Sequence, residues 1–147
     1  MWLAPSSPFA AQSWSEYLGS WSLWLQQVYM NTLYGRGGLN VRRYWIWKAA
    51  QAEAQNLLWT DEKGYYFCNI VTVLPDQQGK GIGKLLFGAV TDRADMEGLR
   101  CYLESSRAEP NMKIYEKMGF ELRRDMRCDD DGDAIALYCM IREPRGM

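Results

Sequence analysis

The sequence predicts an α/β (α+β) fold in which helices flank a central mixed sheet and a Trp-rich helical part comes first. Apolar residues recur at helical spacing in the first 63 residues, and after Gly64 aromatic and β-branched runs alternate with further helical stretches. With 147 residues, 48 % of them hydrophobic, the chain can bury one core of ordinary size. We therefore expect a helical segment over residues 1–63 and a sheet-containing core over residues 64–147.

The first helix is expected to begin after Ser13 or Ser15, either of which can cap it, and to end before the glycines that follow Tyr34. Its opposite face carries Ser, Gln and Asn, whereas anionic lipid attracts Lys and Arg. We therefore expect its apolar face to pack in a core or against a partner, with an aromatic acceptor pocket as the second interpretation. The apolar positions, spaced by three and four residues, are Trp14, Tyr17, Leu18, Trp21, Leu25, Val28 and Tyr29.

A second helix is expected over residues 41–58, because the stretch is rich in Ala, Gln and Glu. Its aromatic contacts, Trp45 and Trp47 among them, are expected to pack in a core. Residues 1–12 show no periodicity, although Met1–Leu3 resembles the stub of a strand.

The second half of the chain predicts the order strand, helix, strand, helix, strand, strand. Aromatic and β-branched residues mark the strands, and Gly98 and Gly119 stop the two helices. The expected strands are 65–74, 99–104, 120–127 and 135–142, the expected helices are 81–97 and 110–118, and a hairpin turn is expected at 129–133.

Composition excludes several classes of function. The net charge of −1 lacks the basic face that a general nucleic-acid binder needs. The chain has no His, which removes His-dependent triads and most catalytic zinc sites. The four cysteines form no CxxC pair, and Cys68, Cys101 and Cys139 are expected to be buried free thiols because they lie in apolar, strand-like runs. The acidic turn fails the EF-hand pattern, since Arg127 stands at position one when Gly132 stands at position six. We therefore expect no metal and no nucleic-acid partner.

The N-terminus shows neither the basic region nor the apolar run of a signal peptide. No stretch reaches the length of about 18 uninterrupted apolar residues that a membrane span needs. These features predict a cytoplasmic, reduced protein without a membrane span.

The glycine-rich turn between Val73 and Lys84 is the most informative segment. A strand ends, glycines follow and a helix begins, so several backbone N–H groups can point at one anion. The P-loop pattern fails, because Gln78 stands where its first Gly belongs and Leu85 stands where Ser or Thr belongs. The dinucleotide fingerprint, started from Gly79, fails as well, because Lys84 occupies its last Gly position.

The pattern [QR]-x-x-G-x-[GA] is met by Gln78, Gly81 and Gly83. This stretch resembles the acetyl-CoA-binding motif of the GNAT superfamily of N-acetyltransferases. The run Ile114–Phe120 is similar to a second signature of that family, [LI]-Y-x-K-x-G-F, and follows in the right order. The resemblance covers about residues 64–142, and the stretch from Leu103 to Ser106 is similar to fungal members.

The resemblance implies acetyl-CoA as cosubstrate. In the family, the strand before the turn pairs its backbone with the pantetheine chain, and the N–H groups of the turn hold the pyrophosphate. Many members also contact pantetheine through an Asn at the position of Ala108, for which Asn111, Ser105 or Ser106 would have to substitute. The cofactor-binding residues so implied are Ile70, Val71, Thr72, Val73, Gln78, Gly79, Lys80, Gly81, Ile82, Gly83, Lys84 and Asn111.

The resemblance also implies the catalytic residues. Tyr115 matches the Tyr that often protonates the leaving CoA thiolate, and its alternative is a core aromatic. Some relatives place a Glu near the position of Phe67, and this strand has no carboxylate. Glu104 is the best remaining base, and a water chain to bulk solvent is the alternative. The two central strands of the family splay apart, which would place Asn69 and Glu104 beside the split.

The expected function is transfer of an acetyl group from acetyl-CoA to a primary amine by direct attack. The alternative is a catalytically degenerate relative that binds CoA or a protein partner without turnover. Before Tyr65 the sequence shows two helices and no hairpin, so the front of the family's fold is expected to be shortened. The segment 1–63 is then expected to form an acceptor wall or a homodimer contact. The acceptor is a small-molecule or peptide amine that the residues do not identify.

Overall fold

The computed structural model describes residues 1–5 and 13–146. Five strands form one sheet in the order β1-β2-β3-β5-β4, in which β2 and β3 are parallel and every other pair is antiparallel. The mixed sheet with flanking helices confirms the predicted fold class. The elements are β1 (Trp2–Leu3), α1 (Trp14–Tyr34), α2 (Val41–Leu58), β2 (Tyr65–Cys68), the short 3-10 turn η1 (Pro75–Gln77), α3 (Ile82–Glu97), β3 (Arg100–Ser105), α4 (Asn111–Lys117), β4 (Glu121–Asp130) and β5 (Asp133–Arg142).

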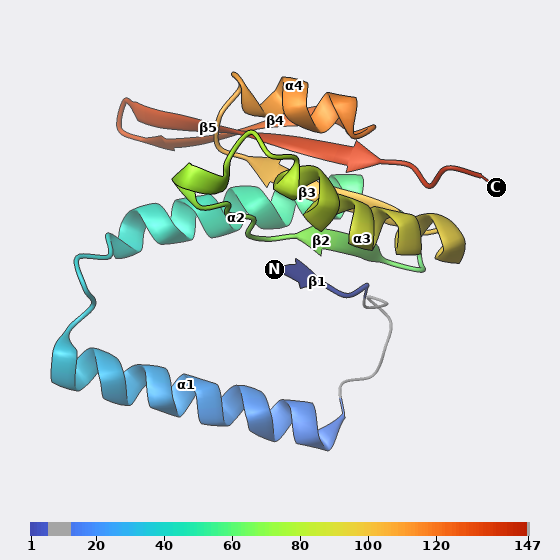
Figure 1. Cartoon of the computed structure of the whole chain (residues 1–147). Helices are drawn as coiled ribbons and strands as arrows, with labels where there is room; N and C mark the ends of the chain where they lie inside the picture. The colour runs from blue at the N-terminus through green and yellow to red at the C-terminus, as the bar shows by residue number, and fades with distance from the viewer. Residues whose placement is uncertain (6–12, 147) are drawn as a thin grey trace.

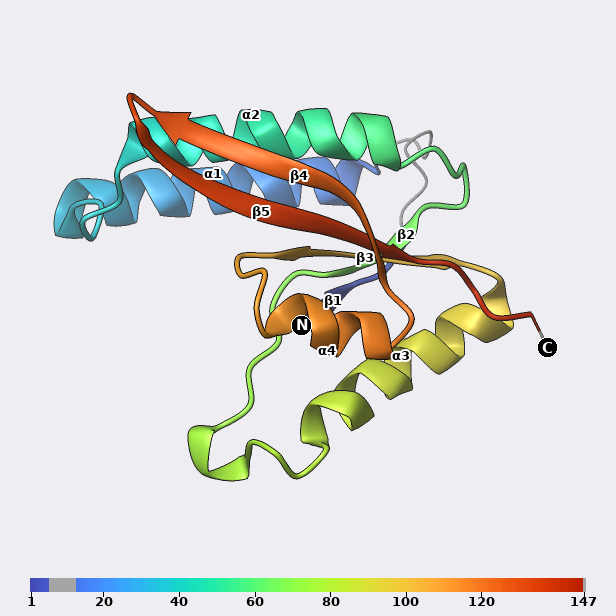
Figure 2. The same ribbon diagram turned by 90° about the horizontal axis from the view of Figure 1, so that it is seen from above.

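Helix α2 covers one face of the sheet, and α3 and α4 cover the other (Figures 1 and 2). Successive residues of a strand point to opposite faces, so each strand contributes to two cores. Tyr66 and Cys68 pack with Phe87 of α3 on one side. Phe67 and Tyr102 pack with Ala54 of α2 on the other side.

The predicted helix boundaries are largely confirmed. Ser13 caps α1 and forms a capping box with Glu16. Helix α2 has the predicted bounds, and Gly98 ends α3 in the left-handed conformation. All four cysteines are free and buried, which confirms the prediction made for Cys68, Cys101 and Cys139.

The expected strand 65–74 is wrong beyond Cys68. Its partner β3 stays paired with β2 only as far as Leu103 and then continues beside β5 alone. On the other side, β1 spans two residues and offers a ladder partner for Phe67 and Cys68 only. The β-branched residues that follow therefore have no strand to pair with, and propensity alone does not make a strand.

The expected core packing of the Trp-rich helix is also wrong. Helix α1 has no buried residue, and Trp14, Trp21 and Trp24 are 82 %, 48 % and 53 % exposed. Figure 1 shows α1 standing apart from the sheet. On α2, Trp47 does pack against the buried cluster, whereas Trp45 is exposed.

The β4–β5 hairpin is longer than expected, and its turn is shorter. Strand β4 runs to Asp130, and Asp131 and Gly132 form a tight turn with φ of 54° and 99°. Arg42 and Arg43 of α2 form ion pairs with the acidic side chains around this turn. Within the described residues no cluster of acidic or thiol side chains could hold a metal ion.

None of the helices in the described part of the chain combines the length and apolar character needed to cross a bilayer.

Candidate active site

Helix α3 begins in a way that leaves its first N–H groups open. Gly81, in the left-handed conformation with φ of 79°, precedes the helix, and no side chain in the described part of the structure caps it. The first backbone N–H groups of a helix have no partner within it, so those of Ile82, Gly83 and Lys84 stay available. Gln78 stabilises the preceding loop, because its Nε2 donates to the backbone carbonyl of Val73 at 3.1 Å. The segment predicted to form an anion cradle therefore ends at a helix start whose N–H groups are open.

A pocket of about 240 Å³ lies where β2 and β3 part. The pairing of the two strands ends at Cys68 and Leu103. Residues from both strands and from α4 line the opening, so the split expected between these strands is present. Its lining residues are Cys68, Asn69, Ile70, Val71, Leu103, Glu104, Ser105, Ser106, Asn111 and Tyr115.

The backbone beside this pocket is partly engaged and partly open. Ile70 is held by Met1, whose carbonyl accepts from the Ile70 N–H at 3.2 Å and whose terminal ammonium donates to the Ile70 carbonyl. Among the described residues, no hydrogen bond engages the backbone groups of Val71 or Thr72. Of the run predicted to pair with pantetheine, Ile70 is therefore already paired, and Val71 and Thr72 remain open.

Tyr115 reaches the pocket from α4. Its ring is half-buried and packs 5.6 Å from the ring of Phe87 and 6.3 Å from that of Phe120. Burial raises the pKa of the Tyr115 phenol above its ordinary value. The hydroxyl therefore stays protonated at neutral pH, as a proton donor must.

The Glu104 side chain lies on the face of the sheet that α2 covers. There it takes part in a hydrogen-bond network that the sequence did not indicate. Gln51 of α2 donates from Nε2 to Oε1 and Oε2 of Glu104 at 3.1 and 2.9 Å. The Tyr102 hydroxyl donates to Oε1 at 3.0 Å. Lys48 donates from Nζ to Oε1 of the Gln51 side chain at 2.9 Å. The carboxylate is thus fixed by two neutral donors, of which Gln51 comes from far away in the sequence.

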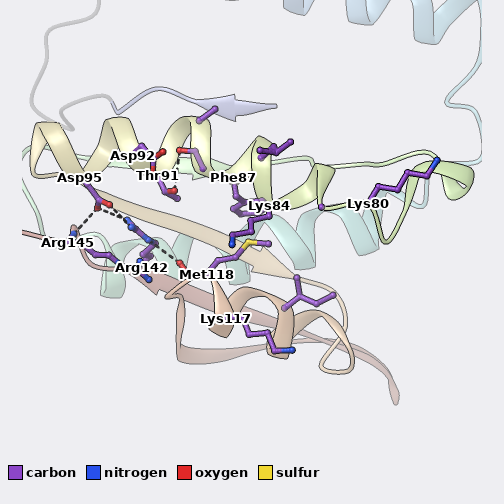
Figure 3. A pocket seen from close by; sticks show the side chains of 15 residues that line it. Lys80, Lys84, Phe87, Thr91, Asp92, Asp95, Lys117, Met118, Arg142 and Arg145 are labelled. Carbon is purple, nitrogen blue, oxygen red and sulfur yellow. Dashed lines mark hydrogen bonds and ion pairs between the residues drawn. The ribbon is translucent and has the colours of Figure 1, made fainter.

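A larger groove of about 1090 Å³ runs between α3 and α4 (Figure 3). Lys80, Gly81 and Lys84 of the predicted cradle line one end. At the other end Arg142 and Arg145 lie beside Asp95 (Figure 3). Basic side chains outnumber acidic ones in the lining, which contains Lys80, Lys84, Lys117, Arg142 and Arg145 against Asp92 and Asp95, so the groove carries net positive charge.

The structure therefore gathers the predicted residues at two places. Glu104, Asn111 and Tyr115 meet at the split, and Lys80 and Lys84 lie at the groove. Thr72 and Val73 line neither. Ser105 is a poor substitute for the missing Asn, because its hydroxyl bonds the backbone of Arg107 as both donor and acceptor.

Gln51 and Tyr102 escaped the sequence analysis. Tyr102 carries a signal, since it precedes Glu104 by two positions on one strand and so shares its face. Gln51 carries none, because only tertiary packing brings α2 to β3.

Comparison with known proteins identifies the family. The model of the acetyltransferase (GNAT) domain matches residues 41–122, more than half of the chain. The chain belongs to the GNAT acetyltransferase family. An uncharacterized N-acetyltransferase from Schizosaccharomyces pombe is 37 % identical to this GNAT chain over 84 residues, which is 57 % of the chain and 33 % of the relative. The alignment thus spans about a third of the relative's length.

Solved structures support the GNAT fold. Arabidopsis thaliana NAA60 in complex with a bisubstrate analogue superposes with a TM-score of 0.52 at 20 % identity, covering 67 % of this chain and 60 % of NAA60. The NAA60 complex with acetyl-CoA superposes with a TM-score of 0.51 at 19 % identity, covering 64 % of this chain and 59 % of NAA60. At this identity the likeness is one of fold.

Proposed function

We propose that this GNAT chain transfers the acetyl group of acetyl-CoA to a primary amine by direct attack. One observation supports this most strongly: the split between β2 and β3 opens into a pocket lined by both Glu104 and Tyr115. A proton acceptor and a proton donor thus lie at one opening, which is what amine acetylation requires. The name of the S. pombe relative, an N-acetyltransferase, supports nitrogen as the acceptor atom.

The residues present fit acetyl-CoA. The open backbone groups of Val71 and Thr72 offer hydrogen bonds to the amides of pantetheine. The uncapped start of α3, with Lys80 and Lys84 beside it, offers N–H groups and positive charge to the pyrophosphate. Asn111 lines the pocket at the split and is the candidate side-chain contact.

Two side chains account for the two proton transfers that the reaction requires. As the amine nitrogen forms its bond to the acetyl carbon, Glu104 accepts the proton that the nitrogen loses. As the carbon–sulfur bond breaks, the Tyr115 phenol supplies a proton to the sulfur. The chain contributes the rest by holding the two reactants together, which alone can supply much of the rate.

We place the amine on the face covered by α2, because Glu104 points to that side. The helical segment 1–63 then supplies the acceptor wall through α2. The exposed face of α1 is the remaining candidate for a homodimer contact.

Thiol release from acetyl-CoA tests the proposal, with spermidine, a lysine peptide and peptides with free Ala or Met N-termini as acceptors. We expect amine-dependent release with at least one of them, and loss of that release in Glu104→Gln. The absence of a carboxylate at Phe67 favours one rival, a relative that binds without turnover. Saturable acetyl-CoA binding with no release for any amine would establish that rival.

A further inference from the structure

The inference concerns how the carboxylate of Glu104 is held. It rests on the proposed function, since it gives Glu104 the role of proton acceptor. We propose that Gln51 is a positioning residue that orients the Glu104 carboxylate so that Oε2 receives the proton of the acceptor amine.

The hydrogen-bond count distinguishes the two oxygens. Oε1 of Glu104 accepts from both Tyr102 and Gln51, at 3.0 and 3.1 Å. Within the described part of the chain, Oε2 accepts from Gln51 alone, at 2.9 Å. A carboxylate oxygen offers about two acceptor sites, so Oε1 is fully used and Oε2 keeps one site free. Glu104 lines the pocket at the split, so we assign this free site to the acceptor amine.

Gln51 is unusual for its place on α2. It is 6 % exposed and is the one buried polar residue of that helix. The other inward positions, Trp47, Ala50 and Ala54, are apolar. Burying an amide costs free energy unless its groups are bonded, so an apolar residue would serve packing better. Bonds to Lys48 and Glu104 satisfy both ends of the amide.

The neighbouring groups keep every hydrogen bond of this network donating toward Glu104. Lys48 donates to the amide oxygen of Gln51, which strengthens the amide N–H groups as donors toward Glu104. Tyr102 is fully buried, and burial, together with the charge of Glu104, raises the pKa of its phenol, so it stays a donor. Cys128 and Cys139 pack nearby, and burial raises the pKa of each thiol, so both stay neutral.

A double-mutant cycle tests the role. The variants are Gln51→Leu, Glu104→Gln and their combination, and Gln55→Leu, one turn along α2 and without a bond to Glu104, is the control. With the best amine of the panel above, we expect Gln51→Leu to lower kcat about tenfold and Glu104→Gln to lower it about a hundredfold. The double variant should be no slower than Glu104→Gln, because Gln51 acts only through that carboxylate. Acetyl-CoA affinity and the KM for the amine should change less than twofold.

Three results would overturn the inference. A double variant about tenfold slower than Glu104→Gln would mean that the effect of Gln51 on the rate does not depend on the Glu104 carboxylate, so that Gln51 does not position it. A Glu104→Gln variant as fast as the wild type would remove the proton acceptor and leave acetyl transfer itself intact. A wild type that binds acetyl-CoA without any turnover would end both proposals together. Gln51→Met, unbranched and of similar length, replaces Gln51→Leu if the latter does not fold.

Discussion

Asp95 of α3 and Arg142 of β5 form a two-point ion pair that joins the helix layer to the sheet. The Arg142 guanidinium donates to both Asp95 oxygens, at 2.7 and 2.6 Å, and its Nε donates to the Met118 carbonyl at 3.2 Å. The Arg142 side chain is 4 % exposed. The pair lines one end of the groove between α3 and α4, so its loss should affect the fold and the groove together.

Breaking this pair should therefore destabilise the protein. Asp95→Asn leaves a buried guanidinium uncompensated, which costs about 3 kcal/mol. The Arg142 guanidinium holds the pKa of the Asp95 carboxyl below its usual range. Its stabilisation is thus present above the unfolded-state pKa of about 3.9 and is lost as the pH falls toward the folded-state value.

Urea denaturation at several pH values measures this effect. The difference in unfolding free energy between the wild type and Asp95→Asn should be large at pH 7 and should shrink below about pH 4. Asp92→Asn, one turn earlier on α3 and outside any ion pair in the described residues, is the control and should change little. A difference that stays constant down to pH 3 would contradict the ion pair.

Gly81→Val should weaken acetyl-CoA binding. Gly81 has φ of 79°, and a β-branched residue there costs about 1–3 kcal/mol of strain. The loop would leave its conformation, and the dissociation constant should rise about tenfold or more. Gly83→Ala is the matched control, since its added Cβ would meet no atom within 4 Å. Equal affinity of Gly81→Val and the wild type for acetyl-CoA, measured by calorimetry, would contradict the proposal that this turn binds the cofactor.

Tyr115→Phe should slow acetyl transfer about a hundredfold without changing acetyl-CoA affinity. The ring and its contacts with Phe87 and Phe120 remain, so only the proton donor is lost. Because burial raises the pKa of Tyr115, loss of its proton should not reduce the wild-type rate between pH 7 and pH 9. An unchanged rate in the variant would assign Tyr115 to packing alone.

Substitutions of two tryptophans should distinguish an exposed aromatic residue of α1 from one that packs against the core. Among the described residues, the ring of Trp21 packs against Tyr17 and Trp24 of its own helix alone, so Trp21→Ser should change the unfolding free energy by less than about 0.5 kcal/mol. Trp59 stacks on Tyr65 and packs against Tyr102, so Trp59→Ala should cost about 3 kcal/mol. A large loss in Trp21→Ser that depends on protein concentration would reveal a second copy covering α1.

Local signals predicted most of the fold. Ser13 and Gly98 marked helix ends because capping is decided by neighbouring residues. The end of β2 at Cys68 was missed because it depends on where β1 and β3 stop. The exposure of Trp21 was missed because an amphipathic face predicts burial without naming what it packs against.

The candidate site divides in the same way. The turn around Gly81 is a local motif and could be found in the sequence. The hold of Gln51 on Glu104 could not, since 53 positions separate the two residues and only the packing of α2 on the sheet joins them. The ion pair of Asp95 with Arg142 was missed for the same reason, with 47 positions between its partners.

Calorimetric titration of the wild-type chain with acetyl-CoA, CoA and ATP tests the central claim most directly. We predict saturable binding of acetyl-CoA and CoA with much weaker binding of ATP, because ATP lacks the pantetheine that we propose binds at the split between β2 and β3. A folded chain that binds none of the three, or binds ATP as tightly as acetyl-CoA, would contradict it.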